Sequence, residues 1–191
     1  MVPRALTLLL ASRSPQRRGI LEAIGVPFRA IDLDVEELET GPAEEVALTN
    51  ARRKASAGGE HARPGETVIA VDTVVTLDDR IWGKPGSDDE ARQTLRALSG
   101  RTHEVVSGIV VGEREGVERT RVAFHELDEA AIDWYVASGE WRGRAGGYAI
   151  QGRGGVLVAR IEGDYLNVVG LPVGRLAQLC GGFAAFLANG T

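Results

Sequence analysis

The 191-residue sequence has only one cysteine and one methionine, and aromatic residues make up 5% of it. A single thiol, Cys180, forms no intramolecular disulfide and builds no metal cluster. It falls in an apolar helical stretch, where we expect it to be buried. The three tryptophans are scattered, and the three histidines lack metal-ligand spacing, so both residue types favour structural roles.

Sequence signals for membranes, nucleic acids and common nucleotide motifs are also missing. No apolar run is long enough to span a bilayer, and the N-terminus lacks the apolar core and cleavage site of a signal peptide. We therefore expect a cytoplasmic protein with no membrane partner. The net charge of −5 argues against a nucleic-acid partner. There is no Walker motif, dinucleotide glycine fingerprint or nucleophile elbow.

Near its start, the sequence has an apolar run at residues 8–10 that turns abruptly into Ser, Arg and Pro and then into a helical pattern. Ser14 suits the N-cap and Pro15 the first helical position, so we predict strand, tight turn and helix. A helix start favours a bound anion, and Ser12 and Arg17 stand beside it. A capped surface helix with a snorkelling arginine explains the same residues, and this stretch alone leaves both open.

Two further stretches combine charge with a defined pattern. The acidic segment 32–37 is typical of a solvated loop, although its carboxylates, Glu37 among them, also suit a divalent cation. The next pattern predicts a helix over residues 42–56, with Lys54 on the same face as its small apolar residues. A lysine on a packing face either snorkels to the edge or finds a partner, so Lys54 is a candidate for phosphate contact.

Residues 68–77 form the most apolar run of the chain, and their β-branched side chains predict a central strand covered on both faces. Asp72 interrupts this run. A carboxylate there is costly unless it is paired, bound to a metal or placed where a strand end opens on a crevice, so we favour a functional role for Asp72. Lys84 follows a turn and a short return strand, and it stands between a glycine and a proline.

Helical and strand patterns alternate through the rest of the sequence. We predict helices at 87–98 and 128–136, strands at 103–111, 121–126 and 155–161, a glycine- and arginine-rich loop at 142–155, and a turn at 167–172 into a last helix that reaches about residue 187. This order predicts an α/β layered fold with a mixed sheet, in one domain over residues 1–191. Such sheets bind ligands beyond the carboxyl ends of strands, where we place Glu37, Lys54, Asp72 and Lys84 around one crevice.

Seven short motifs follow one another along nearly the whole chain: residues 10–18 (LASRSPQRR), 35–37 (VEE), 51–55 (ARRKA), 71–75 (VDTVV), 83–85 (GKP), 98–103 (LSGRTH) and 167–172 (NVVGLP). Each motif is weak alone, and the ordered set is highly specific. Together they resemble the Maf family of nucleoside triphosphate pyrophosphatases, whose members were first described as septum-formation inhibitors.

The resemblance implies a mixed-sheet, Maf/ITPase-like fold with a central cleft, usually in a homodimer. It also implies cleavage of a nucleoside triphosphate to a monophosphate and pyrophosphate with a divalent metal, Mg²⁺ or Mn²⁺. By their places in the motifs, Asp72 is the implied proton acceptor, and Glu37 and Asp72 are the implied metal ligands. The implied substrate contacts are Ser12, Arg17, Lys54 and Lys84.

The resemblance also implies that Gln16, Thr73 and Gln151 stand at the positions that determine which base is preferred. Thr73 and Gln151 match the specificity positions of the subgroup that acts on dTTP and UTP, whereas that subgroup carries Arg in place of Gln16. Arg144 and Ala149 also depart from the family pattern, which usually has Lys and Gly there. Two alternatives stay open: a 7-methyl-GTP pyrophosphatase, and a nucleotide-responsive regulator of septum formation without useful turnover.

Overall fold

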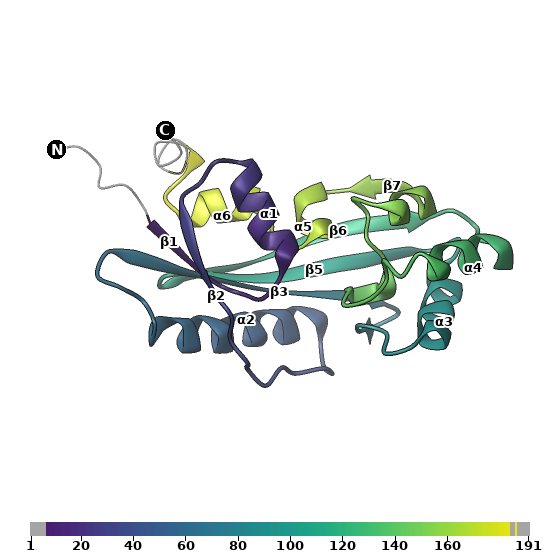
Figure 1. Ribbon diagram of the computed structural model, residues 1–191, viewed down its shortest axis with the longest axis horizontal. Helices are drawn as coiled ribbons and strands as arrows, with labels where there is room; N and C mark the ends of the chain where they lie inside the picture. The colour runs from purple at the N-terminus through teal and green to yellow at the C-terminus, as the bar shows by residue number, and fades with distance from the viewer. Residues whose placement is uncertain (1–6, 184–185, 187–191) are drawn as a thin grey trace.

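The computed structural model describes residues 7–183 and 186, and a seven-stranded mixed sheet lies at its centre (Figure 1). The elements in chain order are β1 (Thr7–Ala11), α1 (Pro15–Ala23), β2 (Phe28–Ile31), α2 (Ala43–Gly59), β3 (Glu66–Leu77), β4 (Arg80–Trp82), α3 (Asp88–Leu98), β5 (Thr102–Val111), β6 (Arg114–Phe124), α4 (Glu129–Ala137), β7 (Val158–Glu162), α5 (Tyr165–Val169) and α6 (Val173–Leu179). Short 3₁₀ turns, η1 (Ala145–Gly147) and η2 (Arg153–Leu157), precede β7. The predicted α/β fold with a mixed sheet is confirmed.

The sheet has the order β2-β1-β3-β5-β6-β7, with β4 paired to the end of β3. β1 runs parallel to β2 and β3, while β3, β5, β6 and β7 are antiparallel neighbours. β3 changes partner along its length, because its register with β1 ends at Ile69 and its register with β4 begins at Val75. Asp72 and Thr73 lie between these two points, beyond the carboxyl end of β1, where α/β sheets bind their ligands.

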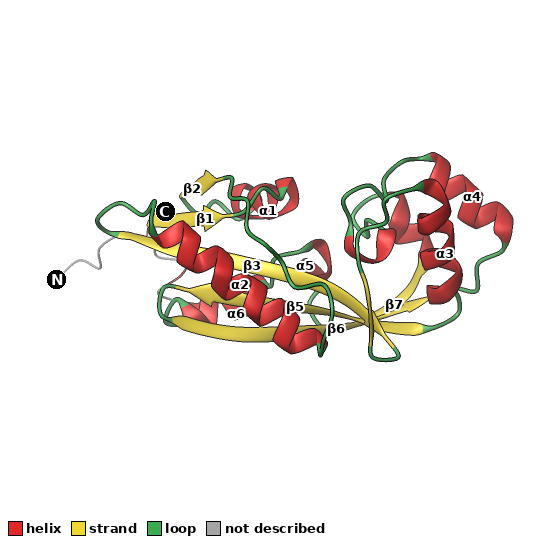
Figure 2. Ribbon diagram, turned by 90° about the horizontal axis from the view of Figure 1, so that it is seen from below, coloured by secondary structure: helices red, strands yellow, loops and turns green. Residues whose placement is uncertain are grey.

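Helices cover both faces of the sheet (Figures 1 and 2). α2 lies along β3 and β5 on one face, whereas α1, α5 and α6 lie on the other, and α3 and α4 pack together at the far end of the long strands. Successive side chains of a strand point to opposite faces, so neighbouring residues of β3 meet different helices. None of the helices in the described part of the chain has the length and apolarity that a membrane crossing requires.

The predicted strand, turn and helix at the start of the chain form as expected. Ser14 is the N-cap of α1, its hydroxyl accepts a hydrogen bond from the Arg17 backbone N–H at 3.4 Å, and Pro15 begins the helix. The same local chemistry starts two other predicted helices, where Ser87 caps α3 and Asp128 caps α4. These helix starts could be predicted because each depends on residues only a few positions apart.

Several predicted boundaries are wrong. β6 begins at Arg114, seven residues before the predicted strand, and its first half was missed because none of its side chains is fully buried and it shows no apolar pattern. The helix predicted to end at residue 56 continues to Gly59. The strand predicted at 155–161 starts at Val158, because residues 153–157 form η2.

The C-terminal predictions also need correction. The turn predicted at 167–172 includes the end of a short helix, α5, which Asp164 caps. The last helix, α6, ends at Leu179, residues 180–182 form a turn and a bend, and residues 184, 185 and 187 of its predicted continuation lie outside the described residues. Cys180 lies just after α6 and is only half-buried.

Candidate active site

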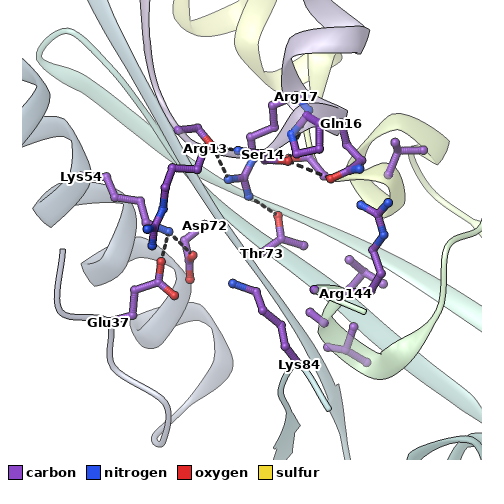
Figure 3. A pocket seen from close by; sticks show the side chains of 18 of the residues that line it. Arg13, Ser14, Gln16, Arg17, Glu37, Lys54, Asp72, Thr73, Lys84 and Arg144 are labelled. Atoms are coloured by element: carbon purple, nitrogen blue, oxygen red, sulfur yellow. Dashed lines mark hydrogen bonds and ion pairs between the residues drawn. The ribbon is translucent and has the colours of Figure 1, made fainter. Parts of the chain in front are cut away.

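A pocket of about 310 Å³ opens beyond the carboxyl end of β1 (Figure 3). Its walls come from the turn between β1 and α1, the segment after β2, α2, the middle of β3, the loop before β7 and the end of α5. All the predicted site residues line it: Ser12, Gln16, Arg17, Glu37, Lys54, Asp72, Thr73, Lys84 and Gln151. The pocket therefore gathers in one place side chains that are far apart in the chain, from Ser12 to Gln151.

On the α2 side of β3, one ammonium group joins two carboxylates. Lys54 Nζ lies 2.5 Å from Glu37 Oε1 and 2.6 Å from Asp72 Oδ1, and 13% of the Lys54 side chain is exposed. The sequence left two alternatives for Lys54, snorkelling to the edge or finding a partner. The structure shows that Lys54 is paired and does not extend into solvent. Two carboxylate oxygens from distant segments thus converge on a single positively charged group.

Asn50 also binds the Asp72 carboxylate, and it was not among the site residues predicted from the sequence. Its amide Nδ2 donates to Asp72 Oδ2 and to the Leu38 carbonyl, both at 3.0 Å, and its Oδ1 accepts from the Leu38 N–H at 2.7 Å. Asn50 is 2% exposed and lies one helical turn before Lys54 on α2. A polar residue four positions before a functional lysine, on the same packing face, is the signal that could have found it.

On the opposite face of β3, Arg17 is fixed from three directions. Its Nε donates to the Gly170 carbonyl at 2.8 Å, Nη1 to Ser12 Oγ at 3.0 Å and Nη2 to Thr73 Oγ1 at 3.2 Å. Arg17 is 8% exposed, which excludes the snorkelling alternative. Burial lowers the pKa of Arg17, and nearby carboxylates oppose that shift, so the guanidinium remains a fixed cation at the pocket wall.

Thr73 connects Arg17 to the sheet. Its hydroxyl accepts from Arg17 and also lies 2.8 Å from the hydroxyl of Ser107, which is fully buried on β5. A hydroxyl has one donor and two acceptor positions, so most of the capacity of Thr73 is used within the protein. Ser107 was missed because a serine within an apolar strand has no distinctive pattern.

Lys84 and Arg144 point into the pocket from the side opposite Arg17 (Figure 3). Within residues 7–183, neither side chain forms a hydrogen bond or an ion pair, and the buried Arg144 Nε has no acceptor. The sequence contains only two lysines, Lys54 and Lys84, and both line this pocket. The pocket therefore holds cations that have no anion of their own within the described protein.

Two amide side chains lie at the pocket edges. Gln16 Oε1 accepts a hydrogen bond from the Ser14 hydroxyl at 3.1 Å, and Gln151 lines the wall formed by the loop before β7. Among the described residues, no group of three or more His, Cys, Asp and Glu side chains could hold a metal ion. Any metal here would therefore take further ligands from a bound molecule or from water.

The fold and the pocket define an α/β protein whose mixed sheet carries a lysine-paired carboxylate in a pocket that also holds two cations unpaired within the described protein, Lys84 and Arg144. The chain belongs to the Maf family: the family described as Maf-like protein matches residues 7–183. It is 45% identical over 171 residues to the dTTP/UTP pyrophosphatase of Pyrococcus furiosus, covering 87% of this chain and 90% of that one. It is 44% identical over 178 residues to the dTTP/UTP pyrophosphatase of Bacillus cereus, covering 90% and 92%. Among solved structures, the Ham1 protein of Staphylococcus aureus matches 64% of this chain and 72% of its own, with a TM-score of 0.44 and 22% identity.

Proposed function

We propose that this protein is a nucleoside triphosphate pyrophosphatase that hydrolyses dTTP and UTP to the monophosphate and pyrophosphate. Curated relatives at 44–45% identity carry that activity in their names. The observation that carries the proposal is the Asp72 carboxylate in a pocket with three cationic side chains from separate segments, Arg17, Lys54 and Lys84. Cations suit a polyphosphate, and the carboxylate beside them suits a proton acceptor.

In this proposal the cations bind and orient the triphosphate. Arg17 presents a guanidinium whose position is fixed by Ser12, Thr73 and Gly170, so little order is lost when a phosphate binds. Lys84 reaches the same space from an exposed loop and has no partner to give up among the described residues. Charge-assisted hydrogen bonds of this kind are among the strongest available to a protein.

A divalent cation fits the residues present. Glu37 and Asp72 already direct carboxylate oxygens at one positive group, the Lys54 ammonium. Mg²⁺ binds in proteins through one or two carboxylates, with the remaining positions filled by water and substrate phosphates. Glu37 and Asp72 would hold such an ion, which when bound neutralises phosphate charge and makes a coordinated water more acidic.

Asp72 acts as the proton acceptor. Asn50 holds its Oδ2, so Oδ1 is the oxygen that faces Lys54 and the pocket. Water attacks phosphorus, the bond between the α- and β-phosphates breaks, pyrophosphate leaves, and the proton of the water passes to Asp72. Lys54 keeps positive charge beside both carboxylates, which allows them to lie next to an anionic substrate.

The base lies, in this proposal, toward Gln16 and Gln151. Both amides line the pocket, and an amide both donates and accepts, as the edge of a pyrimidine does. Thr73 has little capacity left for direct base contact, because Arg17 and Ser107 already share its hydroxyl. We therefore expect Thr73 to affect the base preference mainly through the position of Arg17.

Pyrophosphate release from a panel of dTTP, UTP, the other common triphosphates and 7-methyl-GTP, with Mg²⁺ or Mn²⁺, tests the proposal. We expect dTTP and UTP to give the highest kcat/KM. A preference for 7-methyl-GTP or another purine would contradict the base assignment. Nucleotide binding without pyrophosphate release from any member would contradict the enzymatic proposal and favour the regulator.

The homodimer implied by the family resemblance and the cytoplasmic location expected from the sequence belong to the same proposal. A cytoplasmic location suits an enzyme that acts on free nucleotides. Size-exclusion chromatography with light scattering measures the first directly, and a mass of twice 20.4 kDa is the expected result. A mass of 20.4 kDa at every concentration would contradict it.

A further inference from the structure

Glu37 and Asp72 come from segments of different character. Asp72 lies in the middle of the long strand β3, whereas Glu37 lies in an irregular segment between β2 and α2. Lys54 draws the two carboxylates together, but a flexible side chain does not set the position of a backbone segment. Some other contact must hold the Glu37 segment in register with β3.

Asn50 supplies that contact. Its amide binds both the N–H and the C=O of Leu38, the residue next to Glu37, and its second N–H binds Asp72 Oδ2. These three hydrogen bonds use both Nδ2 protons and the Oδ1 acceptor. Only one orientation of the amide satisfies them, because the reverse would place Oδ1 against the Leu38 carbonyl and the Asp72 carboxylate.

We propose that Asn50 is a positioning residue that sets the distance and orientation between the two carboxylates of the active site. It aims Asp72 by occupying Oδ2, which leaves Oδ1 to the pocket, and it anchors Leu38 so that Glu37 meets the same point. This inference rests on the proposed function for its catalytic consequence, whereas the anchoring itself is a property of the fold. Removal of such a supporting contact typically costs about 10–100-fold in activity or metal affinity.

Two variants separate the components of this role. Asn50→Leu keeps the branched arrangement of the side-chain heavy atoms and removes all three hydrogen bonds. Asn50→Asp keeps the acceptor for the Leu38 N–H, but it places an oxygen against Asp72 Oδ2 and the Leu38 carbonyl. Should Asn50→Leu fail to fold, Asn50→Asp carries the same test of the contact with Asp72.

Ser99→Ala is a matched control. Like Asn50, Ser99 hydrogen-bonds both backbone groups of a distant residue. Its hydroxyl accepts from the Leu127 N–H at 2.7 Å and donates to the Leu127 carbonyl at 3.4 Å. It lies at the end of α3 and does not line the pocket. A loss caused only by general destabilisation would appear in this variant as well.

The experiment compares Tm, kcat and KM for dTTP, and hydrogen exchange of the Leu38 amide in these proteins and in wild type. We expect kcat to fall by about 10–100-fold in both Asn50 variants, with KM within about threefold of wild type. Ser99→Ala should keep wild-type kcat. Hydrogen exchange at the Leu38 amide should be about tenfold faster in Asn50→Leu than in wild type. In Asn50→Asp it should stay close to the wild-type rate.

Asn50 variants that lose no more kcat than Ser99→Ala would overturn the positioning role. If wild type released pyrophosphate from no triphosphate, the proposed function would fail. Hydrogen exchange at the Leu38 amide would then be the only test of whether Asn50 anchors this segment. In that case, faster exchange in Asn50→Leu supports it, and unchanged exchange overturns it.

Discussion

Gly108 of β5 lies directly opposite Asp72 of β3, and the backbone of α2 rests on this glycine. A Cβ atom built at Gly108 would be 2.5 Å from the carbonyl carbon and oxygen of Ala47 and from the Leu48 Cα. The absence of a side chain at this position therefore lets α2 approach the sheet closely enough for Asn50 and Lys54 to reach Asp72. The close approach depends on space rather than on an unusual backbone conformation.

Gly108→Ala should push α2 away from the sheet. Overpacking typically costs about 1–3 kcal/mol, and for a chain of this size each kcal/mol lowers Tm by about 2–4 °C. Displacing Lys54 and Asn50 by about 1 Å should also lower kcat by about 10²-fold. Calorimetry and pyrophosphate release measure the two effects.

Gly174→Ala is the control for that change, because a Cβ at this glycine of α6 meets nothing within 4 Å. It should keep activity and leave Tm unchanged or slightly higher. Equal behaviour of the two variants would contradict the account of Gly108.

The two lysines should respond differently to removal of their charge. Lys54→Met separates two carboxylates from their shared counter-charge, so both Tm and kcat should fall. Lys84→Met removes an exposed side chain with no partner among the described residues, so kcat should fall while Tm stays constant. We expect a loss of about 10²–10³-fold in kcat for each, as for other groups that stabilise transition-state charge.

Chemical labelling checks the same point independently. Of the two lysines, Lys84 should react first with an amine-directed reagent, because Lys54 is mostly buried and paired. Bound nucleotide should protect Lys84, and peptide mass spectrometry locates the label. Labelling of Lys84 that leaves turnover intact would remove it from the phosphate site.

His103 should make the protein less stable in mild acid. It is 1% exposed, and its Nε2 lies 2.8 Å from the Tyr148 hydroxyl. Burial lowers the pKa of His103 to about 4, so the unfolded chain binds a proton more readily than the folded one between pH 6.5 and 4. Stability is therefore lost as the pH falls through this range, by about 2 kcal/mol from pH 7 to pH 5.

Urea unfolding of wild type and His103→Gln at pH 7 and pH 5 measures this contribution. Glutamine keeps a hydrogen-bonding group near Tyr148 and does not titrate, so the variant should lose less stability between the two pH values. The same pH dependence in both proteins would contradict the assignment to His103.

Activity should require a divalent cation. Glu37 and Asp72 are the only carboxylates among the described residues that line the pocket, so most of the remaining ligands must come from the substrate and water. Excess chelator should abolish pyrophosphate release, and added Mg²⁺ or Mn²⁺ should restore it. Full activity in excess chelator would contradict this prediction, because the cationic side chains would then neutralise the phosphates without a metal.

Local signals made part of the structure predictable from sequence. Ser14 and Pro15 mark a helix start within a few residues, and Asp72 is conspicuous because a charge interrupts an apolar strand. The first half of β6 was missed because none of its side chains is fully buried, and strand pairing there depends on the β5 backbone.

The contacts that complete the site were less predictable, since they join residues far apart in the chain. Asn50 acts on Leu38 and Asp72, and Ser107 acts on Thr73 across two strands. Gly108 matters because of a helix whose position is visible only in the folded molecule. Such roles follow from tertiary packing, which local periodicity does not report.

The proposed role of Asp72 as acceptor of the proton from the attacking water is tested most directly by Asp72→Asn. Asparagine has nearly the same size, and Lys54 keeps its ion pair with Glu37, so the variant should fold and bind nucleotide. Melting temperature, dTTP binding and pyrophosphate release are measured on one preparation. We expect a Tm near that of wild type, retained binding and turnover lower by about 10²–10⁴-fold. Turnover near the wild-type rate would contradict this role.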